Sequence, residues 1–171
     1  MKLFLDTNVL IDFILERPLF YQPAAMIVSL AAERKIDICV SALSVVTANF
    51  ICIERCKMPL DVYRRKVDFL RNFIEVCSVD SSDINSSYEA NWKDFEDGVQ
   101  YFSAIRSGVD YLVTRNVKDF EENDLKVITV DEACRLLWLI LLGAVGRYVA
   151  LFADLSINIL LFEFKVVDLR C

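Results

Sequence analysis

The sequence of 171 residues contains no histidine. This absence excludes the Ser-His-Asp and Cys-His catalytic arrangements, because both use an imidazole as the general base. It also excludes zinc sites built on imidazole and the usual proton shuttle near neutral pH. Any acid–base or metal chemistry must therefore depend on Asp and Glu side chains.

The sequence also lacks an excess of basic residues, since it has 19 Lys and Arg but 25 Asp and Glu, which gives a net charge of −6. A protein that coats nucleic acid needs a basic face, so the composition argues against that class. An enzyme that holds a cation and meets nucleic acid through it remains compatible with this charge.

The six cysteines form no Cys-x-x-C pair, and most lie in apolar runs, where a free cysteine behaves as a small hydrophobic residue. Cys52 and Cys56 would share a helix face, but two thiols alone make a poor zinc site. The opening residues carry an acid at Asp6 and no small-residue cleavage site. We therefore expect no signal peptide and a cytoplasmic location.

Short apolar runs alternate along the chain with apolar residues at helical spacing. The runs that predict strands are residues 2–5, 36–40, 75–79, 111–114 and 127–130. This alternation predicts an α/β fold with a largely parallel central sheet. Polar residues follow four of these runs, namely Asp6, Asp80, Asn116 and Asp131. The carboxyl edge of such a sheet is where ligands bind, so we expect the functional site there.

The last part of the chain has a different character, because residues 136–164 are almost continuously apolar. One interpretation is a buried or interface helix that continues the helix predicted from Glu132. The alternative is contact with a membrane, since about 20 apolar residues can span one. Arg147 and Asp154 oppose a span, each costing about 3 kcal/mol at the bilayer centre.

Acidic residues occur in three places that a parallel sheet could bring together. They are Asp6, the D-F-E-D segment with Asp94, Glu96 and Asp97, and Asp119 beyond T-R-N. Asp6 has an ordinary alternative role as a helix cap, and the D-F-E-D segment as charge at a helix N-terminus. Carboxylates about 5 Å apart would repel by roughly 3 kcal/mol at an effective dielectric constant near 20, so a cluster needs a cation or raised pKa values. Oxygen ligands without histidine favour Mg²⁺ or Mn²⁺, ions that support phosphodiester cleavage.

Four segments, in this order and spacing, resemble the PIN domain family over about residues 1–137. They are FLDTNVLID at 4–12, SALS at 41–44, DFEDGVQYFSA at 94–104 and DYLVTRNVKDF at 110–120. The resemblance implies a PIN-like, Rossmann-like α/β/α sandwich with a central, mostly parallel sheet. It also implies a Mg²⁺- or Mn²⁺-dependent endoribonuclease like the VapC toxins, with an RNA substrate, a small antitoxin partner and a homodimeric state. Residues 138–171 would then form a hydrophobic extension.

The resemblance assigns roles to individual residues. Asp6 and Asp97 match the metal-binding aspartates, and Asn116 stands in the catalytic T-x-D/N element where an aspartate is common. Four further residues are expected to support the site or substitute as ligands, namely Asn8, Asp94, Thr114 and Asp119. Asn8 would orient Asp6. The family usually has a glutamate where this chain has Thr47, so two of four usual carboxylates are neutral here.

Arg115 and Lys118 are candidates for contact with RNA phosphates, because they flank Asn116. The neutral Thr47 and Asn116 leave a second hypothesis, a catalytically weakened PIN-like module that binds RNA or protein. A haloacid-dehalogenase-type phosphatase is disfavoured, because that chemistry needs an aspartate where this chain has Asn8.

Overall fold

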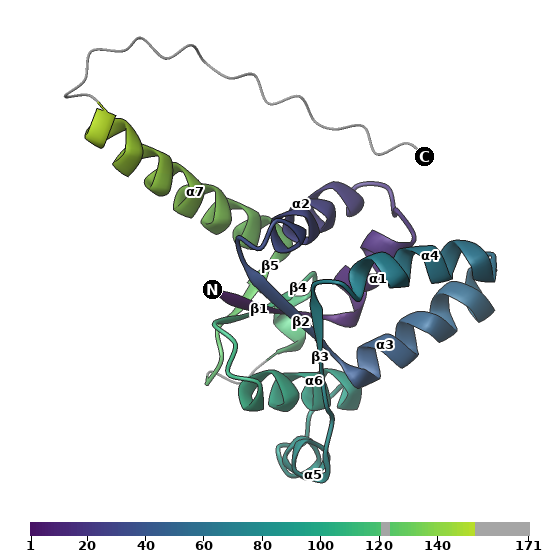
Figure 1. Ribbon diagram of the computed structural model, residues 1–171. Helices are drawn as coiled ribbons and strands as arrows, with labels where there is room; N and C mark the ends of the chain where they lie inside the picture. The colour runs from purple at the N-terminus through teal and green to yellow at the C-terminus, as the bar shows by residue number, and fades with distance from the viewer. Residues whose placement is uncertain (121–123, 153–171) are drawn as a thin grey trace. The chain divides into compact units, whose positions relative to one another are not determined.

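The computed structural model describes residues 1–120 and 124–152, with residues 143–152 described by their backbone alone. The chain divides into two compact units, Met1–Leu136 and Leu137–Cys171. The first unit contains a five-stranded sheet in the order β3-β2-β1-β4-β5 (Figure 1). Its strands are β1 Lys2–Leu5, β2 Asp37–Ser41, β3 Ile74–Cys77, β4 Tyr111–Thr114 and β5 Val127–Thr129. All neighbouring strands are parallel, which confirms the predicted α/β fold.

Helices separate the strands along the chain. They are α1 Thr7–Ile14, α2 Tyr21–Ala32, α3 Ala42–Asn49, α4 Leu60–Leu70, α5 Ser81–Glu89, α6 Phe95–Arg106 and α7 Val130–Phe152, together with the π-helical η1 Phe50–Arg55 and the 3₁₀-helical η2 Val117–Asp119. In Figure 1, α6 lies on one side of the sheet, and α1 and α2 lie on the other. The arrangement is the predicted α/β/α sandwich.

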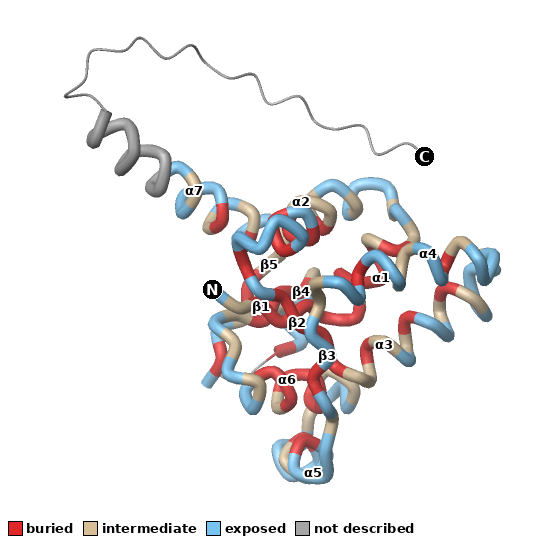
Figure 2. Tube along the Cα trace, in the orientation of Figure 1, coloured by how far each residue is buried: buried red, intermediate tan, exposed pale blue. Residues whose placement is uncertain are grey.

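The core surrounds β1, the central strand of the sheet, and its neighbour β4. Leu3, Phe4 and Leu5 of β1 are at most 1% exposed, as expected for a parallel strand covered on both faces. Phe4 and Leu112 pack with Tyr101 of α6 in one buried cluster. Figure 2 shows this concentration of buried residues along the central strands.

The start of α6 is held close to α5 by a glycine. A Cβ atom at Gly98 would clash with the Ser87 hydroxyl and the Trp92 ring. Trp92 also packs against Tyr101 and Phe120, with ring centroids 5.1 and 5.7 Å away. These contacts fix the first turn of α6 relative to the sheet, and this turn carries Asp97.

Helix α7 begins with a capping box, since the Glu132 carboxylate accepts a hydrogen bond from the Thr129 N–H at 2.8 Å and the Thr129 hydroxyl accepts one from the Glu132 N–H. The boundary predicted at residue 137 lies within this helix. Within residues 1–120 and 124–152, no helix is long and apolar enough to cross a membrane. Residues 153–164 of the apolar segment lie outside the described residues.

Candidate functional site

A cavity of about 230 Å³ lies where the carboxyl ends of β1 and β4 meet the first turn of α6. Five acidic residues line it, namely Asp6, Asp94, Glu96, Asp97 and Asp119. No Lys or Arg of the described chain is among its lining residues. The predicted functional edge of the sheet is therefore a negatively charged cavity with no cationic side chain in its wall.

Asp6 lies at the base of the cavity, between β1 and α1, and only 2% of it is exposed. Its Oδ2 accepts hydrogen bonds from the Thr114 hydroxyl at 2.7 Å and from the Asn8 side-chain amide at 3.2 Å. Its Oδ1 accepts the Asn8 backbone N–H, so Asp6 also caps α1. Burial raises the pKa of Asp6, and the hydrogen bonds from Thr114 and Asn8 partly oppose that rise. The carboxylate is thus held in one orientation by residues of β4 and α1.

Asp97 lies in the first turn of α6 and is partly buried, and its carboxylate is close enough to Asp6 for the two negative charges to repel each other. Burial, followed by the negative charges of Asp6 and Asp94, raises its pKa to about 7. Asp94 precedes α6 as its N-cap and accepts hydrogen bonds from the N–H groups of Glu96 and Asp97 at 3.0 and 3.4 Å. The proximity of Asp6 and Asp97 therefore has an electrostatic cost that only a proton or a cation would relieve.

The T-R-N segment places its first and third residues at the cavity. Thr114 lines the cavity, donates to Asp6 and accepts the Asn116 backbone N–H at 3.1 Å. Asn116 and Asp119 also line the cavity and are exposed. The structure thus brings together all the predicted site residues from Asp6 to Asp119 except the two basic ones.

Arg115 contacts other side chains of the protein, whereas a residue reserved for RNA phosphates would extend into solvent. Its Nε lies 3.4 Å from a carboxylate oxygen of the buried Asp12, and its guanidinium donates to the Asn8 side-chain oxygen at 3.2 Å. The guanidinium also stacks over the Phe20 ring, 4.6 Å from the centroid. Arg115 therefore supports Asn8, which in turn donates to Asp6.

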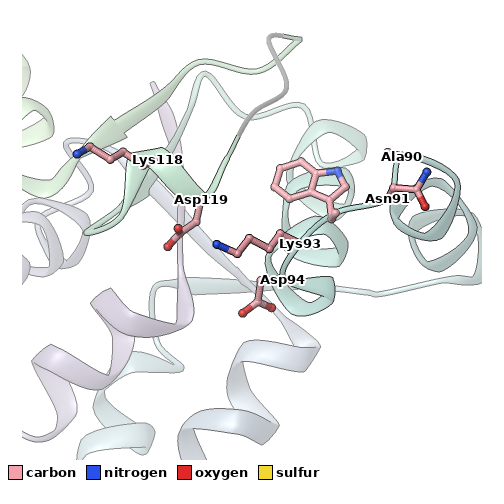
Figure 3. A pocket seen from close by; sticks show the side chains of 7 residues that line it. Ala90, Asn91, Lys93, Asp94, Lys118 and Asp119 are labelled. Atoms are coloured by element: carbon pink, nitrogen blue, oxygen red, sulfur yellow. The ribbon is translucent and has the colours of Figure 1, made fainter.

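Lys118 lines a second, neighbouring pocket of about 340 Å³. This pocket shares Asp94 and Asp119 with the acidic cavity and also includes Trp92 and Lys93. Figure 3 shows the Lys93 side chain extending between Asp94 and Asp119, whereas Lys118 extends away from them. Lysine side chains thus reach the edge of the site through this pocket.

A buried polar network behind the cavity has no counterpart in the sequence-based predictions. The Gln100 side-chain oxygen accepts hydrogen bonds from the Thr7 N–H, the Thr7 hydroxyl and the Ser44 hydroxyl at 3.0–3.2 Å. Its amide also donates to Asp6. A single glutamine thus links α1, α3 and α6, and its only sequence signal is an amide among the apolar residues of α6.

Glu96 was named in the sequence only as part of the acidic D-F-E-D segment and received no individual role at the site. Its partly buried carboxylate accepts hydrogen bonds from the Thr47 hydroxyl and from the Thr7 hydroxyl at 3.4 Å. Burial raises its pKa, and the contact with Thr47 opposes that rise. The sequence could not show which acid of D-F-E-D turns inward, because this depends on the rotation of α6.

The donor chemistry of the cavity fits a hydrated Mg²⁺ or Mn²⁺ ion. Asp6 and Asp97 supply hard oxygen ligands without a competing cation in the wall. Among the described residues, no three Asp, Glu or Cys side chains converge closely enough to hold a bare ion. Mg²⁺ usually retains several waters and needs only one or two carboxylates, so this spacing is compatible with it.

Comparison with known proteins gave one family model, described as PIN domain, which matches residues 2–118. Ribonuclease VapC1 of Aquifex aeolicus is 26% identical over 140 residues, covering 78% of this chain and 93% of that protein. A chain of the DNA-bound VapBC2 complex of Rickettsia felis has a TM-score of 0.57 at 17% identity, over 75% of this chain and 98% of that one. A chain of DNA-bound VapBC from Salmonella typhimurium has the same TM-score at 19% identity, over 76% and 98%. These structures share the fold.

Proposed function

Because the chain belongs to the PIN domain family, we propose that it is a Mg²⁺- or Mn²⁺-dependent endoribonuclease and the toxin of a toxin–antitoxin pair. The observation that carries this proposal is the cavity that Asp6 and Asp97 line together, whose wall includes no basic side chain from the described part of the chain. The similarity to Ribonuclease VapC1 supports RNA as the substrate.

Asp6 and Asp97 would hold the ion, and Asn116, Asp94 and Asp119 would complete the site around it. When bound, the ion would activate water and neutralise charge on the phosphate oxygens. The protein contributes orientation, because Thr114 and Asn8 fix the Asp6 carboxylate through hydrogen bonds. The Asp97 carboxyl, with a pKa of about 7, would lose its proton when a cation offsets the neighbouring charges.

RNA phosphates would be repelled by the acidic cavity unless a cation were present, which restricts cleavage to the ion-bound protein. We propose Lys118 as a phosphate contact at the edge, because it is exposed and follows the strand that leads to Asn116. Arg115 remains a proposed contact as well, and its ion pair with Asp12 would hold it near Asn8.

A small antitoxin and a second copy of the chain are the proposed protein partners. Structures with the same fold belong to VapBC complexes and to a toxin–antitoxin complex from Klebsiella pneumoniae. The chain also has an apolar cavity of about 200 Å³ between α1, α4 and the edge of the sheet, lined by Leu10, Ile14 and Val67 among others. An apolar side chain of a partner helix could be buried there.

The proposal is tested by incubating the purified protein with a mixture of single-stranded RNAs in the presence of Mn²⁺, Mg²⁺ or a chelator. We expect cleavage with either ion, loss of cleavage on chelation and recovery when the ion is restored. Cleavage that persists in the chelator would contradict metal dependence. The absence of any cleavage would favour the second candidate, a non-catalytic module, which the neutral Thr47 and Asn116 at the cavity support.

A further inference from the structure

Glu96 lines the acidic cavity on the side formed by α1 and α3. Its hydrogen-bond partners are Thr7 of α1 and Thr47 of α3. The charges of Asp6 and Asp94 act on both Glu96 and Asp97, but Asp97 also interacts with Asp119, which follows β4. The two successive acids of α6 therefore face two sides of one cavity, as expected for residues about 100° apart around a helix.

The inward position of Glu96 is not explained by a role at the helix terminus. Asp94 already caps α6, accepting the N–H groups of Glu96 and Asp97. A glutamate that only complemented the helix dipole would gain most by remaining in solvent, where its charge has no desolvation cost. The Glu96 carboxylate is instead partly buried beside two threonine hydroxyls, close enough to Asp6 for the two negative charges to interact.

We infer that Glu96 is a third carboxylate of the metal site, acting on a hydrated ion from the α3 side of the cavity, where Thr47 also lines the wall. This inference rests on the proposed function and extends it to a residue with no assigned role. Thr47 acts as a positioning residue, because its hydroxyl donates to the Glu96 carboxylate, and the Thr7 hydroxyl lies 3.4 Å from the same carboxylate. Carboxylates that contact a bound ion through its ligands typically change metal affinity by 10- to 100-fold.

The test is a calorimetric titration of Mn²⁺ into the metal-free protein, which requires no RNA substrate. We expect Glu96→Gln to weaken Mn²⁺ binding by at least about tenfold, because the amide keeps the size of the side chain but not its charge. Glu89→Gln on α5 is the matched control, since Glu89 is exposed and does not line the cavity. Its affinity should remain that of the unmodified chain.

A second variant separates loss of charge from loss of structure. Adding Thr47→Glu to Glu96→Gln returns a carboxylate to the same side of the cavity from α3, and we expect it to recover most of the lost affinity. Melting curves without metal would show that each variant is folded. Because Gln retains a hydrogen-bond acceptor for Thr7 and Thr47, we expect no fall in the melting temperature of Glu96→Gln.

The outcomes distinguish this inference from the proposed function. If Glu96→Gln binds Mn²⁺ as tightly as the unmodified chain while Asp97→Asn does not bind it, the inference is wrong and the metal site stands. If the unmodified chain binds no Mn²⁺, both are wrong. If affinity falls in Glu96→Gln and Thr47→Glu does not recover it, Glu96 has a structural role instead.

Discussion

Asp6→Asn is expected to reduce RNA cleavage by at least about three orders of magnitude, equivalent to about 4 kcal/mol of transition-state stabilisation. The reason is that Asp6 is the most buried carboxylate of the cavity and faces Asp97, so its charge is central to holding the ion. Cleavage rates under saturating Mn²⁺ and at several RNA concentrations would measure the effect.

The fold should survive this substitution. An asparagine oxygen can still accept the Thr114 hydroxyl, and the uncharged side chain no longer has the desolvation cost that raises the pKa of Asp6. Asp61→Asn is the control, because Asp61 forms only an exposed ion pair with Arg65 on α4, and we expect cleavage within about twofold of the unmodified chain. Substantial cleavage by Asp6→Asn would remove Asp6 from the metal site.

Asp97→Asn is expected to stabilise the metal-free protein at pH 8 and to change its stability little at pH 4. The pKa of Asp97 is raised from 3.8 to about 7 in the folded chain, so the folded state binds the proton more tightly than the unfolded state does. Stability from this group is therefore complete below pH 4 and is lost as the pH rises to about 7. At 1.36 kcal/mol per pH unit, the loss is at most about 4 kcal/mol, and screening of this partly exposed group reduces it.

Melting temperatures measured from pH 4 to pH 8 in a chelator would test this prediction. The unmodified chain should lose stability relative to Asp97→Asn across that range, and Glu89→Gln should follow the unmodified chain. Parallel pH profiles for the unmodified chain and Asp97→Asn would contradict a raised pKa for Asp97 in the folded chain.

The sequence was sufficient to predict the sheet and the polar residues at the carboxyl ends of its strands. Parallel strands buried on both faces appear as short apolar runs, and a polar residue must follow where each strand emerges. Asp6 follows Leu5 for this reason, and the structure places it at the edge of the sheet. The resemblance to the PIN domain family was confirmed by the family model, which matches residues 2–118.

The orientation of side chains around the site could not be predicted in the same way. The burial of Glu96 depends on how α6 is rotated, and Gly98 sets that rotation through contacts with Ser87 and Trp92. The position of Arg115 depends on Asp12 and Phe20, which come close to it only in the folded chain. Long-range packing of this kind has no signature within a short window of sequence.

The central claim, a divalent metal site at Asp6 and Asp97, is tested most directly by the melting temperature with and without Mn²⁺ for the unmodified chain and Asp97→Asn. An ion at a hundred times its dissociation constant adds about 2.7 kcal/mol, which for a chain of this size raises the melting temperature by about 5–10 °C. We predict this rise in the unmodified chain and its loss in Asp97→Asn. An equal rise in both proteins would place the ion elsewhere, and no rise in either would contradict the metal site.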